Sequence, residues 1–197
     1  MRRDSKLPRS FYDRPTLTVA RELLGKHLVF VRRGVRLSGK IVEVEAYIGE
    51  DDPACHAAPG LTRRNAVMYG RPGFSYVYFI YGMYYCMNVV TERKGFPAAI
   101  LIRAAEPDEG IEKMAASSPK IVRHLLLSGP GRFCRSLGLT TSHSGLDLLG
   151  DRLFIEDRGA STGQLVSTPR IGINKGMDHQ WRLFDGSSTA VSAQRKK

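Results

Sequence analysis

Cysteine and tryptophan are scarce in this sequence, and the few cysteines form no recognisable pattern. The 197 residues include 3 cysteines and 1 tryptophan. Cys55, Cys86 and Cys134 are odd in number and widely spaced, which excludes a disulfide framework and offers no zinc-binding spacing. We therefore expect a reducing compartment, no metal site and no cofactor.

Signals for export or membrane insertion are also lacking. The first ten residues, MRRDSKLPRS, contain no apolar segment of a secretory signal, and no hydrophobic run approaches the length of a membrane span. These absences predict a protein that is not secreted and has no membrane partner. The expected location is the cytoplasm or nucleoid of a bacterium, or the nucleus of a eukaryote.

Acidic residues are the minority among charged residues, with 19 Asp and Glu against 30 Lys and Arg and a net charge of +11. Clustered Lys and Arg supply the salt-sensitive, sequence-independent part of nucleic-acid binding, so this balance favours a polyanionic partner. Five of the acids, Glu43, Glu45, Glu50, Asp51 and Asp52, fall in a stretch with no basic residue. Because an acidic island opposes polyanion binding, we expect some of them to serve chemistry, and the last three to form a solvated loop.

Tyrosine, by contrast, is concentrated in one run. Five of the 8 tyrosines lie in YVYFIYGMYYCMN, residues 76–88. A buried tyrosine usually needs a hydrogen-bond partner, and an ordinary core is built from Leu, Ile or Phe instead. Flat rings with polar tips suit stacking on a planar ligand. In a basic chain, the first such ligand to consider is a nucleobase.

Length and a hydrophobic content of 42% predict one substantial core and a mixed fold. Alternation over 40–48 predicts a strand with Glu43, Glu45 and Tyr47 on the same face as Ile41. The remaining elements expected from periodicity and turn residues are strands over 27–31, 76–80, 84–90, 98–104, 153–155 and 170–173, and helices over 17–24, from 107, over 120–127 and up to 138.

Two strands of that set, 76–80 and 84–90, predict a hairpin with Tyr81 and Gly82 at its tip. Large residues on both faces indicate that these strands are central and covered. Residues 49–68 are expected to form a long loop, a common place for functional residues. A turn at 128–131 leads into a helix whose free N–H groups, with Arg132, could hold a phosphate; an ordinary Pro-started helix is the alternative.

Four polar residues stand out near these elements. Arg103 is the one charge in the apolar strand over 98–104, and a buried charge needs a partner or a ligand. Glu45 lies beside Tyr47 on its strand, His56 lies in the loop beyond, and Asn88 ends the tyrosine run. Each taken alone has an ordinary structural interpretation, as an ion-pair partner, a loop hydrogen bonder or a turn residue.

Together these segments resemble the 3-methyladenine (alkyladenine) DNA glycosylases of the single-domain, mixed α/β type. The resemblance rests on GKIVEVEAYIGEDDPACH, YVYFIYGMYYCMN, AILIRAAEP, LSGPGRFC and RIGIN, which occur in family order over roughly 17–184. It implies a mixed α+β fold: a single domain with a curved, largely antiparallel β-sheet, a protruding β-hairpin and surrounding helices. It also implies a basic segment over 1–16, the glycosylase domain over 17–185 and a flexible tail over 186–197.

The family resemblance further implies an activity. The protein would be a monofunctional DNA glycosylase that flips alkylated or deaminated purines (3-methyladenine, 7-methylguanine and hypoxanthine) out of duplex DNA and hydrolyses the N-glycosidic bond. Glu45 would be the general base that activates water, and Arg103 would help to hold that water. The implied partner is double-stranded DNA containing damaged purines, and the implied state is a monomer.

The resemblance also assigns binding roles. Tyr47, His56 and Tyr78 would line the pocket and stack on the flipped purine, and Asn88 would collide with the exocyclic amine of normal guanine. Tyr81 would wedge into the duplex where the base left.

Some features depart from the family pattern. Arg132 stands where a lysine is common, and we expect it to contact the DNA backbone with a different geometry. Residues 114–124 read MAASSPKIVRH in place of a basic run, which predicts weaker backbone contacts there.

Two other function classes remain open from the sequence. A non-catalytic minor-groove or single-strand binder would use the same basic surface and rings, but it gains nothing from a carboxylate among them. An enzyme acting on another planar substrate, such as a free nucleoside, is disfavoured by the net charge of +11.

Overall fold

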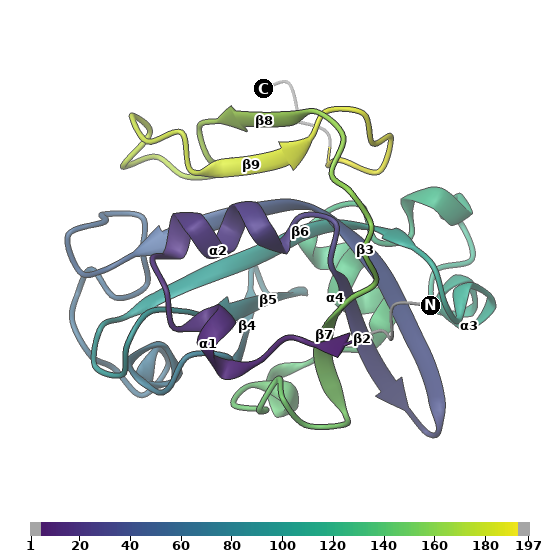
Figure 1. Cartoon of the computed structure of the whole chain (residues 1–197), viewed down its shortest axis with the longest axis horizontal. Helices are drawn as coiled ribbons and strands as arrows, with labels where there is room; N and C mark the ends of the chain where they lie inside the picture. The colour runs from purple at the N-terminus through teal and green to yellow at the C-terminus, as the bar shows by residue number, and fades with distance from the viewer. Residues whose placement is uncertain (1–4, 193–197) are drawn as a thin grey trace.

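The protein is built on one large antiparallel sheet of a single mixed α/β domain, seen in a computed structural model that describes residues 5–192 (Figure 1). Across this range nine strands form the sheet, in the order β1-β7-β2-β3-β6-β5-β4, with β8 and β9 attached to β3. Their bounds are β1 Ser5–Lys6, β2 His27–Arg32, β3 Val35–Ile48, β4 Ser75–Ile80, β5 Tyr84–Val90, β6 Ala98–Pro107, β7 Leu153–Asp157, β8 Leu165–Thr168 and β9 Arg182–Asp185. The sheet is open because β1 and β4 lie at opposite ends of that order.

Helices are few and short. They are α1 Arg9–Tyr12, α2 Thr16–Leu23, α3 Ile111–Ala116 and α4 Pro130–Leu137, with single 3₁₀ turns at Ala66–Tyr69, Arg123–Leu125 and Thr141–His143. Helix α2 crosses the near face of the sheet over β3 and β6, and α4 lies behind the sheet against β5 and β6 (Figure 1). The predicted mixed fold with a largely antiparallel sheet is confirmed.

Strand β3 is long and irregular, and its irregularity shapes the site. It pairs with β6 along one edge, but the register shifts between Ile41 and Glu43 and again between Glu43 and Val44. Such bulges bend a strand and re-aim side chains. The predicted alternation is therefore wrong at the first shift, where Ile41 joins Val44 in the main core and Val42 packs elsewhere. Beyond the shifts, Glu45 and Tyr47 still share a face with Glu43.

Helix α4 shows why a short segment folds as predicted. Pro130 occupies the first turn, where its missing N–H costs nothing, and Gly138 ends the helix with φ of 79°. Phe133 and Cys134 are buried against the sheet. The predicted end at Gly138 is confirmed.

Two predicted elements are wrong, and the helix expected from 107 begins only at Ile111 because Pro107 still belongs to β6. Residues 120–127 do not form a helix, because Leu127 and Ser128 turn their backbone to β6 and bond Ala105 and Ala104 there. Residues 170–173 do not form a strand, because their polar groups bond the buried carboxylates described below. Strands β8 and β9 were not expected from the pattern.

The hairpin of β4 and β5 exists as predicted, but its position differs. β4 is an edge strand of the sheet rather than a central one, so Phe79 is 45% exposed. The sequence could not distinguish the two, because an edge strand with aromatic residues on both faces has the same pattern as a covered one.

The end of the described chain packs against the sheet. Ala190 and Ser192 are buried, and Ala190 packs with Val42 and Ala104. Part of the expected tail over 186–197 thus contacts the domain, and 193–197 lie outside the described residues. Near the other end, Leu7 and Tyr12 are buried in the main core.

Candidate active site

A cavity of about 520 Å³ opens among β3, β4, β5 and β6, closed on other sides by two loops around 53–56 and 171–174. Six of the residues predicted for the site line it: Tyr47, His56, Tyr78, Tyr81, Asn88 and Arg103. Segments far apart in the sequence thus meet at one cavity. Two predicted residues lie outside the lining. Glu45 is directly behind it, and Arg132 follows Pro130, which does line it.

Glu45 lies on β3 with no exposed surface, and three groups bind its carboxylate. The Tyr47 hydroxyl donates to Oε2 at 2.9 Å, and Arg103 Nη1 lies 3.2 Å from the same oxygen. The Ile171 backbone N–H donates to Oε1 at 2.7 Å. Burial of a charge requires such compensation. Since Tyr47, Arg103 and Ile171 all line the cavity, Glu45 is one contact away from anything bound there.

Arg103 lies on β6 opposite the second register shift of β3. Because Glu43 pairs with Ala104 and Val44 with Ile102, Arg103 has no Cα partner on β3. Its Nε donates to Glu43 Oε1 at 2.9 Å, so one guanidinium bridges the two buried carboxylates of β3. Burial disfavours its charge, but Glu45 and Glu43 outweigh that effect and raise the pKa of Arg103. Strand alternation predicts Glu43 beside Glu45 but indicates no role for it, because its buried ion pairs depend on tertiary contacts that the pattern does not encode.

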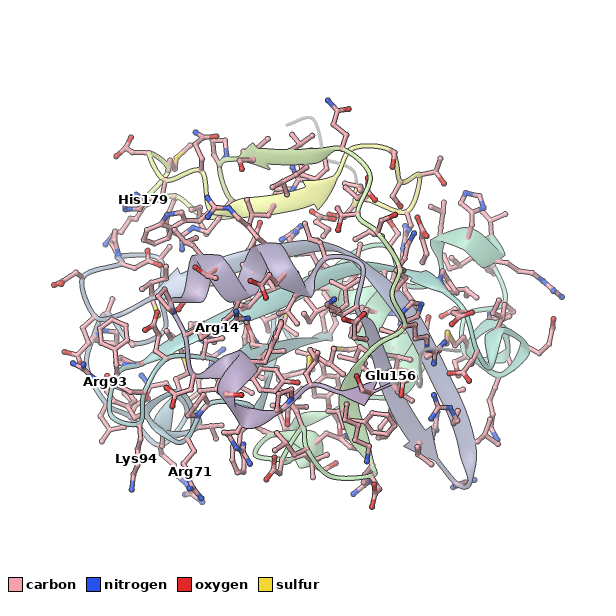
Figure 2. The ribbon with its side chains drawn as sticks, in the orientation of Figure 1. Arg14, Arg71, Arg93, Lys94, Glu156 and His179 are labelled. Atoms are coloured by element: carbon pink, nitrogen blue, oxygen red, sulfur yellow. The ribbon has the colours of Figure 1, made fainter. Side chains whose placement is uncertain are left out.

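A second buried ion pair supports Tyr47 from behind. Arg170 binds Asp52 through both terminal nitrogens, at 2.5 and 2.8 Å, and both side chains are fully buried. The Arg170 guanidinium lies over the Tyr47 ring at 4.7 Å and over the Trp181 ring at 5.0 Å. His179, labelled in Figure 2, stacks on Trp181 at 3.9 Å. The expectation of a solvated acidic loop is therefore wrong for Asp52, although Glu50 and Asp51 are exposed.

Tyr47 remains a hydrogen-bond donor at every relevant pH. Burial, followed by the Glu45 carboxylate, raises its pKa well above the ordinary value. The neutral phenol therefore keeps its proton directed at Glu45, and the ring contributes one side of the cavity.

Another side of the cavity consists of neutral rings. His56 and Tyr78 meet edge to face with centroids 4.5 Å apart, and Tyr76 lies 5.3 Å from Tyr78. His56 Nδ1 and the Tyr76 hydroxyl are 2.8 Å apart. Burial, with a smaller effect of Arg64, lowers the pKa of His56 to about 4. Burial also raises the pKa of Tyr76 to about 12.

Tyr76 also belongs to the cavity, although the sequence pattern indicates no role for it in the site. It lines the cavity and bonds His56. Tyr84 and Tyr85 do pack structurally: Tyr84 faces Gly131 of α4, and Tyr85 packs on Phe79 and the main core.

Asn88 is held rigidly at the base of the hairpin. It is 3% exposed, pairs across the ladder with Tyr76, and its Nδ2 donates to the Tyr76 carbonyl at 3.0 Å. A side chain fixed in this way can exclude a ligand group by shape.

The hairpin tip, unlike the buried Asn88, is exposed to solvent. Tyr81 is 74% exposed and takes a positive φ of 54°, which an ordinary residue adopts only in a constrained turn. Its neighbour Met83 is 62% exposed. An exposed aromatic ring at the tip of a turn is accessible to a partner.

Basic side chains surround this region and extend beyond it. Arg132 is exposed on α4, and Arg64 lies over the Tyr78 ring at 5.2 Å. Elsewhere Arg71, Arg93 and Lys94 project outward together from one side of the molecule (Figure 2). The positive charge is therefore spread over more than one surface.

Two classes of feature are missing from residues 5–192. No group of three or more His, Cys, Asp and Glu side chains there could hold a metal ion. None of the helices described is long and apolar enough to cross a membrane.

A buried carboxylate with an arginine, next to a cavity of stacking rings, is the arrangement expected of a hydrolase that acts on a planar base. A family model described as methylpurine-DNA glycosylase matches residues 10–188. The chain therefore belongs to the methylpurine-DNA glycosylase family. It is a DNA glycosylase, a repair enzyme whose substrate is DNA.

Relatives match over nearly the whole chain. A protein of Methanocella arvoryzae is 51% identical over 191 residues, covering 94% of this chain and 95% of its own. One of Wolbachia from Brugia malayi is 54% identical over 177 residues, 90% and 95% of the two chains. One of Alkaliphilus oremlandii is 48% identical over 199 residues, 95% and 98%. Each is provisionally named a 3-methyladenine DNA glycosylase.

Proposed function

We propose that this protein excises alkylated or deaminated purines of the 3-methyladenine, 7-methylguanine and hypoxanthine class from duplex DNA, starting base excision repair. The observation that carries the proposal is the buried Glu45 carboxylate, held by Arg103, Tyr47 and Ile171 at the side of a cavity lined with rings. The names of the relatives support the same substrate class.

The enzyme can reach the N-glycosidic bond only after the target base has left the base stack of the duplex. This extrusion costs a few kcal/mol, and the cost is lower for damaged bases. Tyr47, His56 and Tyr78 would receive the flipped purine. Stacking on such rings contributes about 1–3 kcal/mol per base. Because His56 is neutral above its pKa of about 4, it would not repel a cationic alkylated purine.

Cleavage of the N-glycosidic bond builds positive charge on the sugar. The ionised Glu45 carboxylate would stabilise that charge and take a proton from the attacking water, while the purine leaves with the bonding electrons. A general base of this kind contributes about 10²–10⁴-fold. Arg103 Nη1, which lies 3.2 Å from Glu45 Oε2, would orient the water.

Water as the nucleophile implies a monofunctional enzyme without lyase chemistry. A bifunctional glycosylase would need an amine that forms a Schiff base. Among the described residues that line the cavity there is no lysine.

Three further residues would act on the DNA around the flipped base. Tyr81 would fill the space that the base leaves, which offsets part of the cost of unstacking. Asn88 would exclude the exocyclic amine of guanine. Arg132 would neutralise a backbone phosphate near the first turn of α4.

The proposal is tested with a labelled duplex that contains one hypoxanthine or 3-methyladenine. The wild-type protein should give an abasic site that alkali cleaves, and Glu45→Gln should lose this activity by at least about 10²-fold while it retains binding. Glu50→Gln is the matched control, because Glu50 is an exposed carboxylate just beyond the end of β3 and accepts a hydrogen bond from Tyr69. Tight binding without abasic product from any modified purine would instead support the non-catalytic binder.

A further inference from the structure

The last described residue, Ser192, contacts the charged groups next to the cavity. Its backbone N–H donates to Glu43 Oε2 at 2.6 Å, and its hydroxyl donates to Glu43 Oε1 at 2.8 Å. Arg103 Nη2 in turn donates to the Ser192 hydroxyl at 3.3 Å. Ser192 is 8% exposed and lies beyond residue 188, where the match to the family model ends.

These contacts determine how the Arg103 guanidinium is oriented. Its Nε binds Glu43, its Nη2 binds Ser192, and its Nη1 lies 3.2 Å from Glu45. A guanidinium is planar with donors in fixed directions, so two contacts on one side set where the third nitrogen points. The position of Nη1 beside Glu45 is therefore set by Glu43 and Ser192, which do not line the cavity.

Glu43 accepts hydrogen bonds from two arginines at one oxygen. Arg182 of β9 donates to Glu43 Oε1 at 2.7 Å, and Arg103 Nε donates to the same atom. Glu43, Glu45, Arg103 and Arg182 form a buried set with two negative and two positive charges. Ser192 adds two neutral donors to this set, one to each oxygen of the Glu43 carboxylate.

We propose that Glu43 and Ser192 are positioning residues for base excision: they hold Arg103 so that its Nη1 points at Glu45 beside the cavity. The proposal rests on the function inferred above, in which Glu45 and Arg103 act on the attacking water. It assigns the segment 186–192 a part in catalysis through Ser192, although no residue of that segment lines the cavity.

The test compares two serines of this one segment. Ser192→Ala removes the hydroxyl that joins Arg103 to Glu43, and Ser188→Ala removes a hydroxyl that bonds Glu106 at 2.6 Å, away from the site. With a hypoxanthine duplex under single-turnover conditions, Ser192→Ala should lower the maximal excision rate about tenfold, a typical effect of losing one hydrogen bond to a charged group. The duplex concentration giving half that rate should stay unchanged, and Ser188→Ala should match the wild type in both.

Glu43→Gln provides a second test, in which the expected effect on the rate is larger. Melting followed by circular dichroism shows whether this variant remains folded. Its maximal rate should fall further than that of Ser192→Ala, again without a change in the half-saturating concentration. A wild-type rate in Ser192→Ala, or an equal loss in Ser188→Ala, would overturn the positioning role while leaving the proposed function intact. Absence of excision by the wild-type protein would overturn both.

Discussion

Two sides of the cavity are built from different chemistry. The charged side consists of Glu45 and Arg103, with Glu43 behind them, and each of these groups is buried and ion-paired. The aromatic side consists of His56, Tyr76 and Tyr78, which are neutral because burial lowers the pKa of His56 and raises those of both tyrosines. It continues along β4 to the exposed Tyr81.

The difference separates chemistry from recognition. Charges that are fixed in a dry environment act strongly on a developing charge without reorganising. Neutral rings can stack on many purines and attract cationic ones by roughly 0.5–2 kcal/mol. Changes on the charged side should therefore lower the excision rate, whereas changes on the aromatic side should alter affinity and selectivity.

The largest effect is expected for Arg103→Gln. It leaves Glu43 and Glu45 buried with one counter-charge fewer, which should cost about 3–5 kcal/mol of unfolding free energy. The excision rate should fall by about 10²-fold or more, because a fixed donor near the reacting groups is lost. Single-turnover assays and thermal melts measure both quantities. A variant that lost duplex affinity instead of rate would contradict the assignment of Arg103 to the chemistry.

Tyr81→Ser should produce the next largest effect, on affinity. Losing the wedge should weaken binding to lesion DNA by about 1–3 kcal/mol, while the rate at saturating duplex changes little. Titration by fluorescence anisotropy measures the affinity. Leu165→Ser is the matched control, since Leu165 is 47% exposed on β8 and lies outside the cavity lining. Unchanged affinity in Tyr81→Ser would remove the wedge role.

Asn88→Gly should alter selectivity. Without the amide that bonds the Tyr76 carbonyl, the cavity can accept the exocyclic amine of guanine, and excision of normal guanine should rise on the order of 10-fold. The released base is measured from undamaged duplex, with hypoxanthine excision as the internal reference. If guanine release does not rise, Asn88 is a structural residue of the hairpin.

His56 should affect the stability of the protein in acid. Its pKa falls from 6.5 to about 4 on folding, so between these values the unfolded chain binds more protons than the folded one. Stability should therefore decrease as pH falls from 6.5 toward 4, and His56→Gln should lose less stability than the wild type over that range. Melting temperatures at half-unit pH steps give the comparison. Parallel curves for the two proteins would show that His56 does not titrate there.

Local sequence patterns were sufficient to predict several parts of the fold. Alternation in 40–48 places Glu43, Glu45 and Tyr47 on one face, because the side-chain period of a strand is two. Pro130 and Gly138 mark the ends of α4, and Tyr81 with Gly82 marks the hairpin turn, because each relies on the backbone preference of a single residue. The resemblance to a family then located the residues that meet at the cavity.

Residue types and local order thus define the strands, turns and candidate groups, whereas tertiary structure alone decides which buried charges meet. Asp52 and Arg170 pair across 118 positions, and Glu43 and Ser192 meet across 149. No periodicity encodes such pairs, and a register shift in β3 moves Arg103 between two carboxylates. A carboxylate in solvent and one buried against arginine look the same in sequence, and only packing removes the water that separates them.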